Sequence, residues 1–272
     1  MAKKAAVIGW PVSHSLSPKL HGYWIEHYGL DASYEAVAIE PNALKGGVGK
    51  LIDAGYVGFN ITIPHKEPII ELLDVIDDTA RAIGAVNTVV IGHGKLLGMN
   101  SDAYGFMANI HSAAAELRSE KAVVLGAGGA ARAVCYALQQ AGFAQIIITN
   151  RTKEKAQLLA DSLGDPIEVA AWEKRNALLA DADLLVNTTS LGMKGKEPLT
   201  IDLAALPAHA VVNDIVYAPL ETDLLRQARA RKLQAVDGLG MLLHQAVPAF
   251  EAWFGQRPQV TAELKQLIVE GL

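Results

Sequence analysis

The 272-residue sequence contains a single cysteine, Cys135, so it cannot form an internal disulfide bond. A chain without a disulfide framework suits a reducing compartment, and we therefore expect a cytoplasmic protein. Charged residues make up only 19% of the chain, and the formal net charge of -5 is spread without an acidic or basic tail. This balance argues against disorder and against a general affinity for nucleic acid.

Long apolar runs are also missing, and none approaches the roughly 20 residues that a membrane helix needs. The apolar segment after Lys4 ends at Gly9 and is too short for a signal peptide. His14, His21 and His27 have no cysteine or acidic partner at a metal-ligand spacing, so we predict no metal site. No nucleophile elbow or Cys-His pattern indicates a hydrolase.

What the sequence does contain is an alternation of short apolar runs with helical stretches. This order indicates βαβ units, a mainly parallel sheet and an α/β fold. The length is comfortable for two domains. We predict strands at 4–9, 33–39, 57–63, 85–91, 96–99, 122–125, 145–149, 184–187, 210–214 and 234–236. We predict helices at 18–28, 43–54, 68–75, 130–140, 152–163, 239–254 and 261–270, with a hairpin-like turn at 92–95.

A glycine-rich segment follows the strand predicted at 122–125 and leads into a helix. It reads Gly126-Ala127-Gly128-Gly129-Ala130-Ala131 and matches the G-x-G-x-x-G/A fingerprint of dinucleotide-binding domains in its required context. The glycines allow a tight turn and a close approach to a pyrophosphate, which the helix N-terminus attracts. The alternative is a strand-to-helix turn that binds nothing, and we favour the cofactor site.

The next strand ends in Asn150-Arg151-Thr152, without the acidic residue that holds the ribose of NAD. The planar guanidinium of Arg151 suits a 2′-phosphate, and Lys155 adds charge nearby. These residues can also be ordinary solvated helix residues. We favour NADP over NAD.

Polar residues follow the strands of the first half as well. Ser15 and Ser17 precede Pro18, where two hydroxyls and a helix N-terminus can hold a carboxylate. Ser17 can equally be a helix N-cap before Pro18, and the sequence leaves both interpretations open. Lys66 lies beyond a strand that carries Asn60 and Thr62, and Asp102 follows another strand. Ligands of open α/β sheets gather at such strand ends.

Eight segments together resemble the shikimate dehydrogenase family, in that family's order. They are S-x-S-P, N-x-T-x-P-x-K, G-A-V-N-T, G-x-N-[TS]-D, G-A-G-G-A, N-R-T, N-T-T-x-x-G-M and G-x-x-M-L-x-x-Q, and they span residues 9 to 245. Each is weak alone, but their combination over most of the chain is specific. One departure is visible, because Ser101 stands where the family usually has Thr.

The resemblance implies roles for individual residues. Lys66 and Asp102 would be the catalytic pair. The substrate would be bound by Ser15, Ser17, Thr62, Lys66, Asn87, Asp102, Tyr217 and Gln245, with the two serines on its carboxylate. The cofactor NADP would be bound by Gly126, Ala127, Gly128, Gly129, Ala130, Asn150, Arg151, Thr152, Lys155, Asp78, Ile215 and Gly238.

The resemblance also implies the domain organisation and the reaction. A substrate domain at 1–103, completed by helices at 239–272, would face a Rossmann domain at 104–238 across a cleft. The reaction would be reversible reduction of 3-dehydroshikimate to shikimate by NADPH, in a monomer or homodimer. A quinate/shikimate dehydrogenase is the nearest alternative. A non-catalytic binding protein of this fold is less compatible with retention of both Lys66 and Asp102.

Overall fold

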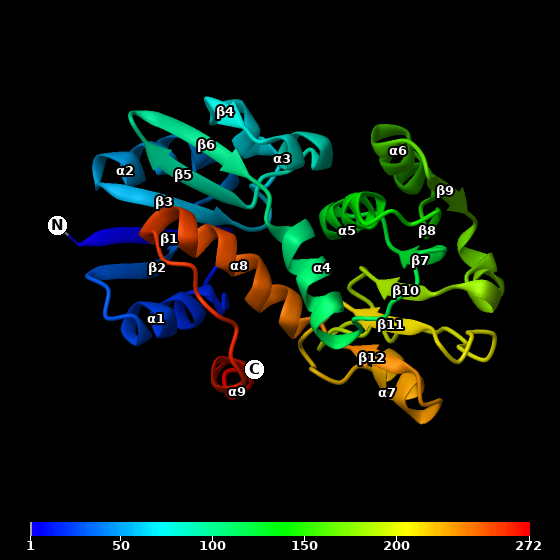
Figure 1. The fold of residues 1–272 in the computed structure, drawn as a ribbon. Coiled ribbons are helices and arrows are strands. Elements are labelled where there is room, and N and C mark those ends of the chain that lie inside the picture. The colour runs from blue at the N-terminus through cyan, green and yellow to red at the C-terminus, as the bar shows by residue number, and fades with distance from the viewer. Residues whose placement is uncertain (1) are drawn as a thin grey trace. The chain divides into compact units, whose positions relative to one another are not determined.

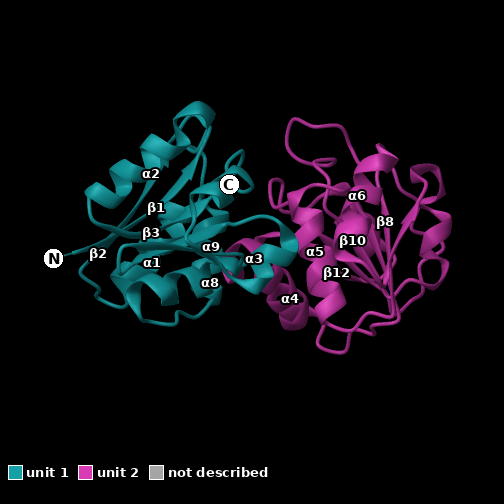
Figure 2. Cartoon of the chain, turned by 90° about the horizontal axis from the view of Figure 1, so that it is seen from above, with its two compact units in different colours: residues 1–101, 245–271 teal, residues 102–244, 272 magenta. Residues whose placement is uncertain are grey.

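Two six-stranded sheets organise the chain (Figure 1). The computed structural model describes residues 2–272 and divides into two units (Figure 2). Unit 1 contains the residues up to 101 together with 245–271, and unit 2 contains 102–244 and Leu272. Each unit carries one of the sheets, so the α/β class with two mostly parallel sheets expected from the sequence is confirmed.

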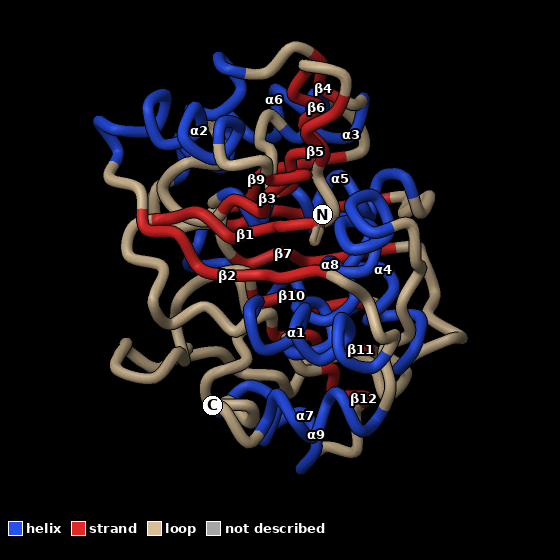
Figure 3. The backbone as a smooth tube through the Cα atoms, turned by 90° about the vertical axis from the view of Figure 1, so that its left-hand side faces the viewer, coloured by secondary structure: helices blue, strands red, loops and turns tan. Residues whose placement is uncertain are grey.

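The sheet of unit 1 has the strand order β2-β1-β3-β5-β6-β4, and β1, β2 and β3 run side by side in Figure 3. Its strands are β1 (Lys3–Gly9), β2 (Ala32–Ala38), β3 (Tyr56–Ile61), β4 (Val75–Ile76), β5 (Thr88–Gly92) and β6 (Lys95–Met99). Its helices are α1 (Ser17–His27), α2 (Leu44–Asp53), α3 (Asp78–Ile83), α9 (Ala262–Val269) and most of α8 (Leu239–Phe254).

Strand direction decides where the polar motifs of unit 1 meet. Only β5 pairs antiparallel with its neighbours, β3 and β6, while β1 pairs parallel with β2 and β3. The carboxyl ends of β1, β3 and β6 therefore share one edge of the sheet with the amino end of β5. That edge receives the segments that follow Gly9, Ile61 and Met99 and the segment that precedes Thr88.

Unit 2 is a doubly wound sheet of parallel strands in the order β12-β11-β10-β7-β8-β9. Its strands are β7 (Lys121–Leu125), β8 (Gln145–Thr149), β9 (Ile167–Ala170), β10 (Leu184–Asn187), β11 (Val211–Asp214) and β12 (Gln234–Val236). Its helices are α4 (Asp102–Ala113), α5 (Gly129–Gln140), α6 (Lys153–Leu163) and α7 (Asp223–Ala230). The strand order reverses between β7 and β10, and such a switch point is where open α/β sheets bind ligands.

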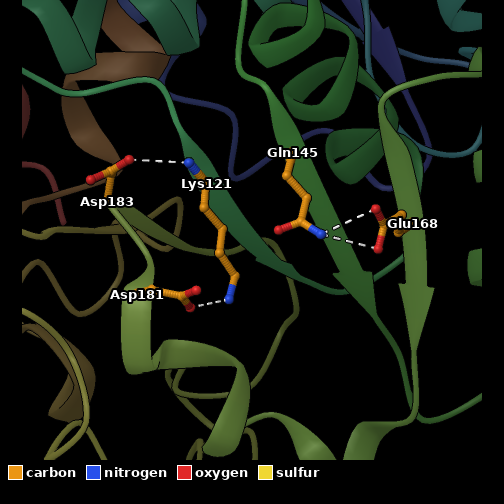
Figure 4. A network of polar contacts seen from close by, with 5 residues as sticks. All are labelled: Lys121, Gln145, Glu168, Asp181 and Asp183. Carbon is orange, nitrogen blue, oxygen red and sulfur yellow. Dashed lines mark hydrogen bonds and ion pairs between the residues drawn. The ribbon is translucent and has the colours of Figure 1, made fainter.

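The amino ends of the unit 2 strands are held by polar contacts (Figure 4). The Asp183 carboxylate precedes β10 and accepts hydrogen bonds from the backbone N–H groups of Glu120 and Lys121, at 2.9 and 3.1 Å. The Lys121 ammonium pairs with Asp181, and the Gln145 amide donates to the carboxylate of Glu168. These contacts fix the strand starts and leave the opposite edge for ligands.

The C-terminal helix α8 is attached to the sheet of unit 1 through Trp253. Its indole N–H donates to the Val89 carbonyl at 3.0 Å. Gly58 makes this contact possible, because a side chain at that position would occupy the space of the indole. The contact secures the last turns of α8 on the sheet, and this helix carries Gln245.

Several parts of the secondary structure differ from the sequence prediction. The helix predicted at 68–75 is wrong, because only Pro68–Leu72 forms a 3-10 helix and the chain then enters β4, which pairs with β6. The strand predicted at 85–91 begins at Thr88, because the Val86 N–H bonds the Lys66 carbonyl at 2.8 Å. The short helix α3, capped by Asp77, and the short edge strand β9 were not predicted.

His21 lies fully buried among aromatic rings of unit 1. Its ring stacks on Tyr34 at 4.1 Å and on Phe250 at 5.8 Å. Within residues 2–272 neither ring nitrogen meets a partner at normal hydrogen-bond geometry, although the Asn60 side chain lies close enough to oppose the change in the pKa of the ring. Burial lowers the pKa of His21 from 6.5 to about 3.

This lowered pKa predicts a loss of stability in acid. The unfolded chain protonates His21 below pH 6.5 while the folded chain does not, so unfolding takes up a proton and becomes easier as pH falls. Between pH 7 and 4.5 this residue should cost about 2.5 kcal/mol of unfolding free energy. Urea unfolding of His21→Phe should show a correspondingly flatter pH dependence. The same change at exposed His27, on the same helix, should leave the wild-type slope, and equal slopes for all three proteins would contradict the prediction.

No helix within residues 2–272 combines the length and apolar character needed to cross a membrane.

Candidate functional site

Asn87 is the centre of the polar edge of unit 1. The residue is 2% exposed, and its side-chain oxygen accepts from the Ser101 backbone N–H at 2.9 Å. Its amide group donates to the Ser101 hydroxyl at 3.0 Å and to the Gln245 side-chain oxygen at 3.4 Å. The structure therefore brings together three segments that are distant in the sequence. Asn87 and Gln245, both predicted to bind substrate, lie in direct contact.

Lys66 and Thr62 lie on the turn that follows β3. The Lys66 carbonyl accepts from the Val86 N–H, one residue before Asn87, and the His65 N–H donates to the Thr62 carbonyl at 3.0 Å. The His65 ring is buried, and its hydrogen bond with the Ile39 carbonyl at 2.7 Å attaches the turn to the segment after β2. His65 thus has a structural role in the turn. The Lys66 side chain is half-buried and keeps part of its surface exposed.

Asp102 is the first residue of α4 and directly follows Ser101. It is 9% exposed, and a carboxylate at the start of a helix is favoured by the helix dipole. The residue before α4, Ser101, donates its backbone N–H to the Asn87 side-chain oxygen. Asp102 follows β6 and Lys66 follows β3, and a carboxyl group and a lysine are side chains that proton transfer and charge stabilisation use.

Ser15 and Ser17 occupy the loop after β1 and the first turn of α1. The Ser17 N–H donates to the Ser15 hydroxyl at 3.3 Å. The interpretation of Ser17 as a capping side chain is wrong, because α1 begins at Ser17 and has no side-chain cap. Both hydroxyls therefore lie at the N-terminus of an 11-residue helix, which favours a carboxylate ligand.

The glycine-rich turn of unit 2 lies at the switch point between β7 and β10. Gly126 has φ +109°, and a methyl group built on it would meet the Thr188 hydroxyl at 2.6 Å. The Thr188 N–H in turn donates to the Leu125 carbonyl at 2.8 Å. Substituents built on Gly128 or Gly129 would meet nothing within 4 Å, so open space lies before the N-terminus of α5. This arrangement fits the pyrophosphate of a dinucleotide.

The segment after β8 carries the residues predicted to read the 2′-phosphate. The Asn150 amide donates to the Thr152 carbonyl at 2.8 Å and shapes the turn into α6. Arg151 and Lys155 are exposed. Arg151 lies 3.9 Å from the carboxylate of Glu197, so the guanidinium has an anionic neighbour on a loop of the same unit. Exposed cations beside the glycine turn fit a phosphorylated ribose.

Asp214 is a buried carboxylate at the end of β11 that sequence reasoning missed. It accepts from the Asn187 amide at 2.9 Å, the Val216 N–H at 3.1 Å and the Thr222 hydroxyl at 2.7 Å. Burial raises its pKa to about 6, against the effect of these hydrogen bonds. An acidic residue that follows Asn213 at the end of an otherwise apolar strand is the signal that could have found it. Asp214 fixes the segment that contains Ile215.

Ile215 and Gly238 are neighbours, as a cofactor wall would require. The Ile215 N–H donates to the Asn187 carbonyl at 3.1 Å, and a side chain on Gly238 would collide with the Ile215 backbone. Tyr217 follows in unit 2, and burial raises its pKa. Asp78 is an exposed residue at the start of α3 in unit 1, away from the glycine turn in the sequence and in a different unit. Over residues 2–272 there is no group of three His, Cys, Asp or Glu side chains that could hold a metal ion.

Comparison with known proteins covers both units. Three family models match, described as the shikimate dehydrogenase substrate binding domain (7–89), shikimate / quinate 5-dehydrogenase (108–205) and the shikimate 5'-dehydrogenase C-terminal domain (238–267). A relative from Paramagnetospirillum magneticum, named shikimate dehydrogenase (NADP(+)), is 53% identical over 271 residues, which cover 98% of each chain.

Solved structures show the same architecture. Shikimate 5-dehydrogenase from Thermus thermophilus, in complex with NADP(H) and shikimate, has a TM-score of 0.89 at 37% identity and covers 99% of this chain and 100% of its own. Quinate dehydrogenase from Corynebacterium glutamicum, in complex with NAD, has a TM-score of 0.92 at 30% identity and covers 99% of each chain. The motifs, the two sheets and these similarities agree, and the chain belongs to the shikimate dehydrogenase family.

Proposed function

We propose that this protein is an NADP-dependent shikimate dehydrogenase, which reversibly reduces 3-dehydroshikimate to shikimate. The observation that carries the proposal is 53% identity over nearly the whole chain to a relative named for that activity. The sites support it, because unit 1 gathers hydroxyl, amide and lysine groups at one edge and unit 2 has a glycine turn followed by Arg151. A cytoplasmic location is part of the proposal and is supported by a single, buried Cys135.

Substrate recognition divides between the ends of the strands of unit 1. Ser15 and Ser17, at the N-terminus of α1, bind the carboxylate. The amides of Asn87 and Gln245 bind ring hydroxyls, each with donor and acceptor atoms to offer. Thr62 of unit 1 and Tyr217 of unit 2 are the other residues proposed to bind substrate. A site built from paired amides and hydroxyls favours a polyhydroxylated acid over an apolar one.

The chemistry assigned to the protein is proton transfer and charge stabilisation. NADPH, when bound, supplies the hydride to the carbonyl carbon. Lys66 offers a positive charge and a proton to the carbonyl oxygen, where negative charge develops. Asp102 acts with Lys66 and binds the hydroxyl that is formed or oxidised. In the reverse direction the same pair removes the hydroxyl proton.

The direct test is the absorbance of NADPH during incubation of the purified protein with shikimate and either NADP or NAD. We expect fast reduction of NADP, slow reduction of NAD and little activity with quinate. Quinate oxidised as fast as shikimate would favour the quinate/shikimate alternative. Absence of any reduction by folded protein that binds NADP would reject the dehydrogenase proposal.

Arg151→Ala tests how the protein selects NADP. Loss of a charge-assisted contact to the 2′-phosphate should raise the Kd for NADP about 10- to 100-fold and leave the Kd for NAD within about twofold. Glu197→Gln should lower the Kd for NADP by a small factor, because it frees Arg151 from an exposed ion pair and such pairs are worth at most about 1 kcal/mol. Arg226→Ala, at an exposed position of α7, is the matched control for removal of an arginine from unit 2. Fluorescence titration measures each Kd, and equal losses for both cofactors in Arg151→Ala would refute the assignment.

A further inference from the structure

Tyr34 is a residue of β2 whose hydroxyl points into the polar edge of unit 1. The hydroxyl donates to the Asn60 side-chain oxygen at 2.7 Å. Burial of this hydroxyl raises the pKa of Tyr34 well above its ordinary value, with the neighbouring Ser17 side chain opposing the rise. The hydroxyl thus contacts Asn60 and lies next to Ser17, one of the two serines proposed above to bind the carboxylate.

The Tyr34 hydrogen bond holds the Asn60 amide in the orientation that the Asn87 carbonyl requires. With its oxygen engaged by Tyr34, the Asn60 amide nitrogen donates to the Asn87 carbonyl at 3.2 Å and to the Thr88 hydroxyl at 3.1 Å. The Thr88 hydroxyl then has its proton available for the Asn87 side-chain oxygen, at 3.0 Å. A flipped Asn60 would bring its side-chain oxygen against the Asn87 carbonyl, two acceptors with no proton between them, so the amide keeps its oxygen on the Tyr34 hydroxyl.

The same chain of hydrogen bonds reaches the proposed substrate groups. Because its oxygen accepts from Thr88 and from the Ser101 N–H, Asn87 directs its amide nitrogen toward Ser101 and Gln245. Asn60, Asn87 and Thr88 are all buried, where unsatisfied polar groups are costly and hydrogen-bonded networks are rigid. The bonds from Tyr34 through Asn60 and Thr88 to Asn87 share one donor direction, whereas the Ser101 hydroxyl both accepts from the Asn87 amide and donates to its oxygen.

The Tyr34 ring is held in place independently of its hydroxyl. It stacks on the buried His21 ring at 4.1 Å with planes 12° apart, and it lies 5.9 Å from the Trp253 ring. Removal of the hydroxyl alone should leave the ring where it is.

We propose that Tyr34 is a positioning residue for the substrate, which orients the Asn87 amide through Asn60 and Thr88. This inference rests on the proposed function of the same site, because the groups it positions are those assigned to the substrate hydroxyls. Tyr34 acts on substrate recognition, whereas the glycine turn and Arg151, proposed to hold the cofactor, belong to the other unit.

The test is steady-state kinetics of Tyr34→Phe with shikimate and NADP. The variant should lose about 5- to 50-fold in kcat/KM for shikimate, mostly through a higher KM, because the Asn60 oxygen loses its donor. The KM for NADP should stay within about twofold, which a general loss of structure would not allow. Tyr56→Phe is the matched control, since its hydroxyl bonds the exposed Glu35 on the same sheet, and it should behave as wild type.

A double-mutant cycle with Thr88→Val separates a relay from a local defect. Thr88→Val removes the next link with little change of shape, and the double variant should lose much less than the product of the two single losses. If wild type fails to oxidise shikimate, the proposed function fails and this inference with it. If wild type is active, the inference alone is overturned by an unchanged KM in Tyr34→Phe, by a parallel rise in the KM for NADP, or by additive losses.

Discussion

Lys66→Met is expected to lower kcat for shikimate oxidation by at least about 10³-fold, with the Kd for NADP unchanged. The substitution removes the proton carrier and the positive charge at the carbonyl oxygen, each of which contributes about 10²- to 10⁴-fold in comparable enzymes. Methionine retains the length of the side chain, and the backbone bond between Lys66 and Val86 does not depend on it. Single-turnover absorbance of NADPH with saturating cofactor measures the chemical step directly.

Asp102→Asn is the companion variant and should also lose orders of magnitude in kcat. Because the two groups act as a pair, the double variant should be scarcely slower than the slower single variant. Lys50→Met, at an exposed position of α2, controls for removal of a lysine from unit 1. Partial recovery of Lys66→Ala by added alkylamines would support the role of the ammonium. Near-normal turnover in Lys66→Met or Asp102→Asn would remove that residue from the mechanism.

The location of the polar edge was predictable from the sequence because it depends on strand ends. Apolar runs marked β1, β3 and β6, and polar residues followed each run, so Ser15, Lys66 and Asp102 could be named as candidates from their positions, with ordinary structural roles left open. Their identification with a substrate came from the resemblance of the combined motifs. The antiparallel position of β5, which brings Asn87 to the same edge, followed only in part from the predicted hairpin with β6.

Contacts between distant side chains left no such pattern. Tyr34 belongs to an apolar-polar alternation that fits any edge strand, and nothing local reveals that its hydroxyl meets Asn60. Asp214 likewise gains its role from Asn187 and Thr222, which belong to other elements. The error at 68–75 has a similar origin, because β4 exists through its pairing with β6 and its two residues are too few for a periodic signal.

Gly126→Ala and Gly128→Ala are expected to separate the two tasks of the glycine turn, which the fingerprint alone does not distinguish. Gly126 adopts φ +109°, and its new methyl group would meet Thr188, so Gly126→Ala should lose about 2–5 kcal/mol of unfolding free energy even without cofactor. Gly128 has φ -92° and open space around it, so Gly128→Ala should unfold within about 0.5 kcal/mol of wild type.

The two variants should rank in the opposite order when NADP affinity, and not stability, is measured. The space before α5 that accepts a methyl group on Gly128 is the space a pyrophosphate must enter to reach the helix N–H groups. Gly128→Ala should therefore weaken NADP by at least about tenfold, because backbone approach is blocked. Thermal unfolding without cofactor and titration with NADP give the two readouts. A Gly128→Ala protein that binds NADP normally would place the pyrophosphate elsewhere, and a Gly126→Ala protein as stable as wild type would show that Thr188 yields to the new side chain.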